Sequence, residues 1–142
     1  MMTPSQIANV LETFQFIAPQ GDEMAEVFFE RLFTREPFLR KVLPQDHWIR
    51  ARDLLTGMGL LVKNLHRLDA IEHVLTEFGA KAQRAGVSPH HYGLARQAML
   101  ATLREFAGDN WNDDVENDWT EALNAASSVV LLGAGRARAK AA

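Results

Sequence analysis

Apolar residues recur at intervals of three and four along almost the whole of this 142-residue chain. That spacing places them on one face of an α-helix, whereas a half-buried strand would alternate apolar and polar residues. No segment of the sequence alternates convincingly in this way. The pattern therefore predicts an all-α protein.

The helix starts are marked by capping residues. Thr3-Pro4 with Gln6, and Ser88-Pro89, each combine a cap with a proline at the first helical position. Further starts are expected at Gly21-Asp22, after Pro44-Gln45-Asp46 and at Asn112, and another helix is expected over residues 68–85. Inside the helix that follows Asp46, Gly57 and Gly59 are expected where another backbone passes close by.

The composition is that of one globular domain. Hydrophobic residues make up 47% of the chain and charged residues 23%, which argues against extended disorder. We expect a single domain of residues 1–142, with its core over about residues 4–132 and a flexible basic tail at 133–142.

Several classes of partner and location are disfavoured by the sequence. A net charge of −3 offers no basic surface for nucleic acid. No apolar run approaches the roughly 20 residues of a transmembrane helix, and the N-terminus carries no secretory signal. The chain has no cysteine, which excludes disulfides and thiolate metal sites. We expect a cytoplasmic protein that binds neither membrane nor nucleic acid.

Local motifs resemble those of bacterial single-domain globins and of the globin part of flavohaemoglobins. They are Phe28-Phe29-Glu30-Arg31-Leu32-Phe33 continuing to Leu39, Pro89-x-x-Tyr92 and Trp119-x-x-Ala122. Residues 77–82, followed by Gly86-Val87-Ser88-Pro89, are similar to the proximal haem side of that family. The resemblance covers about residues 4–132 and implies a globin fold of six to eight helices.

On the proximal side, the resemblance places the family's haem-ligating histidine at Ala82. A bracing tyrosine of the last helix falls on Leu123, and only Tyr92 is retained. Ala82 shares a helical face with Ile71, Val74, Leu75 and Phe78, so we expect that face to point inward, with Phe78 in the pocket. The plain interpretation of Tyr92 is a core residue with a satisfied hydroxyl.

On the distal side, the family's pocket tyrosine falls on Phe29 and its glutamine on Arg50. The phenylalanine that wedges the haem ring falls on Leu43, and Leu54 completes the implied pocket. Two interpretations of Arg50 stay open. Its guanidinium could clamp the carboxylate of an apolar ligand, or form a surface ion pair with Asp46 or Asp53.

These changes have a direct chemical meaning. Alanine offers no lone pair to iron, and phenylalanine offers no hydrogen bond to bound dioxygen. We therefore expect no haem, and a non-enzymatic sensor, adaptor or binder of a small apolar or carboxylate-bearing ligand or of a protein partner. The alternative is a globin with haem b in atypical ligation that binds or senses O2 or NO. The sequence is compatible with an open and with a collapsed pocket.

His90 and His91 are the alternative metal or haem ligands. Neighbouring residues of a helix point about 100° apart, so the two rings are not expected to converge on one ion, and no metal site is expected. Small residues on the outer faces of the last two helices predict a homodimer.

Overall fold

The computed structural model describes residues 2–141, and the helices expected from the sequence are present. The α-helices are α1 (Pro4–Ile17), α2 (Gly21–Arg35), α3 (Phe38–Val42), α4 (His47–Lys63), α5 (Glu72–Ala85), α6 (Pro89–Ala107) and α7 (Asp113–Ala141). Three short 3-10 helices connect them: η1 (Ala18–Gln20), η2 (Leu68–Ile71) and η3 (Gly108–Asn110). Residues 2–141 contain no strand, so the all-α prediction is confirmed. None of the helices described combines the length and apolarity that crossing a membrane requires.

Helix starts follow the capping signals in the sequence. Thr3 Oγ1 accepts a hydrogen bond from the Gln6 backbone N–H at 3.2 Å, and Gln6 Oε1 accepts one from the Thr3 backbone N–H at 2.8 Å. Asn112 Oδ1 caps α7 by accepting from the Val115 backbone N–H at 2.9 Å. Because these side chains satisfy backbone donors that the helix leaves free, the boundaries are fixed locally.

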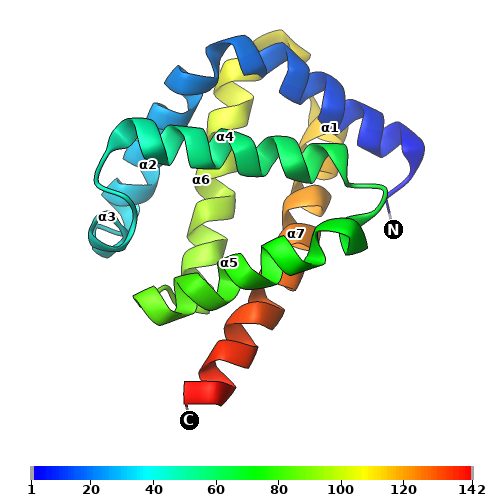
Figure 1. Ribbon diagram of the computed structural model, residues 1–142. Helices are drawn as coiled ribbons and strands as arrows, with labels where there is room; N and C mark the ends of the chain where they lie inside the picture. The colour runs from blue at the N-terminus through cyan, green and yellow to red at the C-terminus, as the bar shows by residue number, and fades with distance from the viewer. Residues whose placement is uncertain (1, 142) are drawn as a thin grey trace.

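The core lies where α1, α2, α6 and α7 meet (Figure 1). Its largest fully buried side chains include Trp119, Leu103 and Met24, one from each of α7, α6 and α2. In Figure 1, α4 runs across the front of this group, packing on α1 and α2, and α5 lies below it. Apolar burial on this scale is the main stabilising term for such a domain.

The tightest helix contact joins α5 and α7. A Cβ atom added at Gly79 would lie 1.9 Å from the Val130 carbonyl oxygen, and one at Gly133 would lie 1.9 Å from the Thr76 carbonyl oxygen. The two backbones therefore touch, which only glycine permits. The expected close approach at Gly57 is wrong, since a Cβ there would meet nothing within 4 Å.

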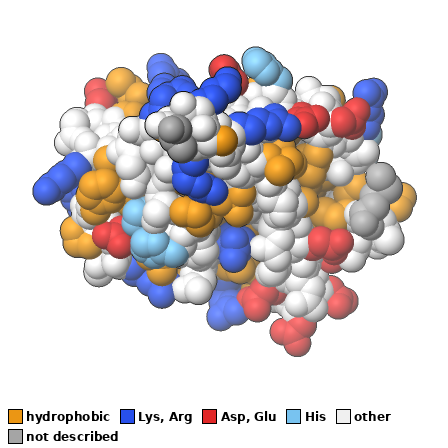
Figure 2. All heavy atoms as spheres, turned by 90° about the horizontal axis from the view of Figure 1, so that it is seen from below, with side chains coloured by type: hydrophobic (Ala, Val, Ile, Leu, Met, Phe, Trp, Pro, Cys, Tyr) orange, Lys and Arg blue, Asp and Glu red, His pale blue; other side chains and the backbone are white. Residues whose placement is uncertain are grey.

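The contact with α7 also sets the rotation of α5. Thr76 and Gly79 face α7, and the side that carries Val74 and Phe78 turns outward, leaving these two residues 50% and 56% exposed. Apolar side chains are visible at the surface in Figure 2, which views the molecule from the side of α5. The expectation that Val74 and Phe78 point inward is wrong, because helix periodicity defines a face but not the neighbour it meets.

The last helix continues into the tail expected at residues 133–142. Helix α7 continues to Ala141, with Gly133 and Ala134 buried, so residues 133–141 are not a non-helical tail. Near this end, Arg138 Nη1 donates a hydrogen bond to Gln83 Oε1 of α5 at 3.1 Å. Gly133 serves helix packing here rather than helix termination.

Candidate functional site

The distal positions form an apolar layer beside the core. Phe29 packs edge-on against Phe28, with ring centroids 5.0 Å apart, and stacks on Phe33 at 5.8 Å. Leu43 and Leu54 are partly buried and pack against the same core. Phe29, Leu43 and Leu54 therefore contribute hydrocarbon and no hydrogen-bond donor.

Arg50 covers this layer with its guanidinium group. The Arg50 Cζ atom lies 5.6 Å from the Phe29 ring centroid and 5.3 Å from that of Phe33. Arg50 Nη1 donates hydrogen bonds to the carbonyl oxygens of Pro44 at 2.7 Å and Gln45 at 3.1 Å. Its Nε atom is buried and has no hydrogen-bond partner within residues 2–141.

Arg50 forms no ion pair with Asp46 or Asp53, so that interpretation of the sequence is wrong. Asp46 instead caps α4, accepting a hydrogen bond from the Trp48 backbone N–H at 2.8 Å. The Asp53 carboxylate faces Arg52 at 3.5 Å on the exposed side of the helix. The guanidinium of Arg50 instead meets the backbone carbonyls of the segment before α4 and the rings of Phe29 and Phe33.

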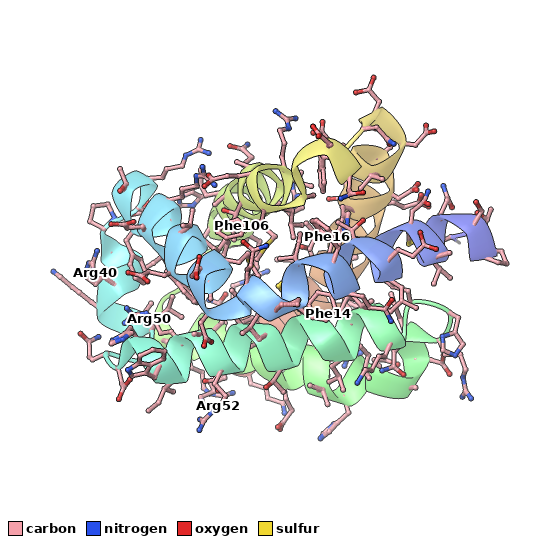
Figure 3. The ribbon with its side chains drawn as sticks, turned by 90° about the horizontal axis from the view of Figure 1, so that it is seen from above. Phe14, Phe16, Arg40, Arg50, Arg52 and Phe106 are labelled. Atoms are coloured by element: carbon pink, nitrogen blue, oxygen red, sulfur yellow. The ribbon has the colours of Figure 1, made fainter. Side chains whose placement is uncertain are left out.

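A second arginine shares this environment. The Arg40 Cζ atom lies 4.6 Å from the Phe33 ring centroid, so both Arg40 and Arg50 stack on one phenyl ring. Figure 3 shows Arg40 and Arg50 together where α3 meets the start of α4, with Arg52 pointing away. Neither Arg40 nor Arg50 has a carboxylate partner within 4.0 Å in the part of the chain that the structure describes.

A cavity of about 410 Å³ opens beside these arginines, between α2 and the first turns of α4. It combines aromatic, basic and acidic side chains. Its lining residues are Asp22, Glu23, Glu26, Phe29, Glu30, Phe33, Arg40, His47, Trp48, Arg50 and Ala51. A volume of this size is within the range of small-molecule sites.

The proximal positions offer different chemistry. Ala82 is half-buried in the last turns of α5 and contributes only a methyl group. The Tyr92 hydroxyl is buried and has no hydrogen-bond partner among the described residues, so the expected satisfied hydroxyl is wrong. Burial raises the pKa of Tyr92, which keeps its phenol protonated. Leu123 packs against the core from α7.

Phe78 does not join the other predicted pocket residues in the interior. It is 56% exposed on α5, which packs mainly against α7, whereas α4 packs mainly against α2 and α1. The residues predicted to form one pocket are therefore divided: Phe29, Leu43, Arg50 and Leu54 are partly buried around α2 and α4, whereas Phe78 is exposed on α5.

His90 and His91 converge, contrary to the expectation from helix geometry. Their ring centroids are 4.2 Å apart. His91 Nε2 lies 3.5 Å from Glu36 Oε2 and His90 Nε2 lies 3.8 Å from the same oxygen. The rings turn toward each other because Ser88, the cap of α6, contacts the Nδ1 atom of each ring.

Sequence reasoning missed four residues of these groups: Phe33, Arg40, Trp48 and Glu36. Phe33 follows Phe29 by four positions on α2, so helical spacing could have paired them. Glu36 is distant in sequence from His90, and no local pattern links the two. Ser88 and His91 stand at the spacing of a capping box, but histidine replaces the usual glutamate or glutamine.

Comparisons with known proteins connect the chain to one family. Residues 26–130 match the family model described as Globin. Flavohemoproteins from Halalkalibacterium halodurans and Vibrio cholerae are each 26% identical to this chain over 125 residues. These matches cover 86% of this chain but 30% and 32% of the two relatives, so the chain spans about a third of their length.

A solved structure supports the same relation. A bacterial globin from Campylobacter jejuni aligns with a TM-score of 0.82 over 94% of this chain and 97% of that chain, at 14% sequence identity. Likeness at such low identity shows the fold alone. The all-α globin fold and the resemblance expected from the sequence motifs are confirmed.

Proposed function

We propose that this chain, which belongs to the globin family, uses the globin fold without the family's conventional haem ligation. It acts as a non-enzymatic sensor, adaptor or binder of a small apolar ligand that carries a carboxylate. One observation supports this choice of ligand: Arg40 and Arg50 both stack on Phe33 beside a cavity of about 410 Å³.

The donor set supports the absence of conventional haem ligation. Haem bound in a globin takes an axial nitrogen from the protein, and Ala82 has no atom that can supply it. Phe29 has no donor for a bound gas molecule. The side chains present therefore do not fit conventional haem coordination.

The arginine pair supports an anionic ligand. A guanidinium group binds a carboxylate through two parallel hydrogen bonds, and Arg40 and Arg50 have no such partner in the described part of the chain. Phe29, Phe33 and Trp48 supply the apolar wall of the same cavity. Asp22, Glu23, Glu26 and Glu30 also line this cavity and would repel an anion. The carboxylate of the ligand must therefore sit at the two arginines, with its apolar part against the aromatic rings.

Absorption spectroscopy tests the haem part of the proposal. We expect the purified protein to be colourless and to give no sharp Soret band when one equivalent of hemin is added. Ala82→His should give a ligand-field spectrum with added hemin, while Arg84→His, about 200° around the helix at an exposed position of α5, should not. A stoichiometric Soret band in the parent that His90→Ala or His91→Ala abolishes would establish atypical haem ligation and the O2 or NO function instead.

Titration calorimetry with decanoate tests the ligand part. We expect binding to weaken about tenfold or more in Arg50→Met, since loss of a paired charge costs about 1.5–3 kcal/mol. Arg52→Met is the matched control, because Arg52 lies two residues away on the same helix and points outward. Equal decanoate affinity in the parent and both variants would show that the arginine pair does not bind the carboxylate.

A further inference from the structure

A group of three ligating side chains lies where α2 ends and α6 begins, apart from the arginine-lined cavity. It consists of Glu36 from the end of α2 and of His90 and His91 from the first turn of α6. One ligand atom from each residue lies within 4.8 Å of the other two. We propose that these three residues bind a divalent ion of the zinc class, with water completing the coordination.

The spacing of the ligand atoms fits this ion. In a tetrahedral zinc site with bonds of about 2.0–2.1 Å, neighbouring ligand atoms are roughly 3.3–3.4 Å apart. The Nε2 atoms of His91 and His90 lie 3.5 and 3.8 Å from Glu36 Oε2. The ligand atoms of His90 and His91 lie within 4.8 Å of each other, so the side chains have to rotate to close the site around an ion. Two imidazoles and one carboxylate favour zinc, nickel or copper over magnesium or calcium.

The backbone of the α6 cap orients both rings. The Ser88 backbone N–H donates to His91 Nδ1 at 2.9 Å, and Ser88 Oγ lies 2.7 Å from His90 Nδ1. Phe38 stacks on the His91 ring, with centroids 6.0 Å apart and planes 22° from parallel. Since the Nδ1 side of each ring is engaged by Ser88, both Nε2 atoms are left to face Glu36.

The hydrogen bond at the α6 cap also determines which proton zinc has to displace. His91 Nδ1 accepts a hydrogen bond, so the proton of the neutral ring is on Nε2 and points toward Glu36. Zinc must displace that proton, which passes to Nδ1 as Nε2 takes the metal, and the Ser88 N–H then loses its acceptor. Binding is therefore in competition with capping of α6, which limits the affinity.

The site is accessible. The His90 side chain is 67% exposed and that of Glu36 is 26% exposed, while His91 is buried beneath them at 8%. Histidine side chains are visible at the surface in the view from below (Figure 2). An ion can thus reach the two outer ligands first and the inner one without opening the core.

Titration calorimetry of untagged, chelator-treated protein with zinc chloride tests the proposal. We expect one zinc ion per chain at a micromolar dissociation constant, and no binding of magnesium chloride. His90→Ala and Glu36→Gln should each weaken zinc binding by about tenfold or more, since even groups behind the ligands of known sites contribute that much. His73→Ala, at an exposed histidine of α5, is the matched control and should bind as the parent does.

Two results overturn the proposal: no zinc binding by the parent at micromolar concentrations, or unchanged affinity in both site variants. His91→Ala is avoided as the main variant because it also removes the α6 cap. Amide resonances report on His91 instead. Zinc should shift the Ser88 amide signal, and an unmoved Ser88 signal with zinc bound would remove His91 from the site.

Discussion

Replacing Gly133 by alanine should separate α5 from α7. The added Cβ would lie 1.9 Å from the Thr76 carbonyl oxygen and 2.6 Å from the Thr76 carbonyl carbon. These are backbone atoms, so no side-chain rotation can relieve the clash. Ordinary contact begins at 3.4 Å, and 3.4 minus 1.9 leaves about 1.5 Å by which the two helices must move apart.

The expected loss of stability follows from two opposing terms. Overpacking of a close-packed contact costs about 1–3 kcal/mol, and the upper part of that range applies where backbone obstructs backbone. Alanine in place of glycine returns about 1 kcal/mol through helix propensity. We therefore expect Gly133→Ala to lower the free energy of unfolding by about 1–2 kcal/mol.

Urea denaturation followed by circular dichroism measures this change, with Gly57→Ala as the control. Gly57 lies inside α4, and a Cβ there meets nothing within 4 Å, so only propensity acts and stability should rise by about 0.5–1 kcal/mol. Gly133→Ala combined with Gly79→Ala should cost less than the sum of the two, because the separation of α5 and α7 that one substitution forces also makes room for the other. If Gly133→Ala matched the gain of Gly57→Ala, the inferred backbone contact would be refuted.

Three further predictions concern single side chains. Thr3→Ala removes the α1 capping box and should lower the free energy of unfolding by about 1 kcal/mol in urea, whereas Ser5→Ala should change it little. The hydrogen bond from Arg104 lowers the pKa of Glu116 below its ordinary value of 4.5. The stability that this hydrogen bond contributes is therefore present above pH 4.5 and is lost as acid protonates Glu116 in the folded protein. Glu116→Gln should therefore flatten the acid limb of a stability-pH curve, and an unchanged limb would contradict this. Tyr92→Phe should leave stability unchanged or raise it, because the lost hydroxyl has no partner in the described chain; a loss of 1 kcal/mol or more in thermal unfolding would reveal a missed hydrogen bond.

The fold was predictable from the sequence because its determinants are local. Caps such as Thr3 and Asn112 fix helix starts within one turn, and apolar periodicity identifies the buried stripes of the core helices, although not that of α5. The role of Gly133 in helix packing could not be predicted, for a reason of tertiary structure. A glycine that ends a helix and a glycine that admits a neighbouring backbone look alike until the neighbour is known.

The candidate site was predictable only in part. Phe29 and Arg50 were located through the family resemblance, and the structure places them together. Arg40 lies beside Arg50 because both contact Phe33. Glu36 lies near His90 because the end of α2 packs against the start of α6. Contacts between residues so far apart in sequence arise from packing, which a single sequence does not encode in any short pattern.

The backbone contact between α5 and α7 makes the two helices one mechanical unit. Gly79 and Gly133 fix the pair at its middle, and the hydrogen bond from Arg138 to Gln83 ties it again nearer the C-terminus. A displacement of α5 that starts beside Ala82 is then shared by the last turns of α7. A change in the position of α5 would therefore also change the position of the C-terminal end of α7.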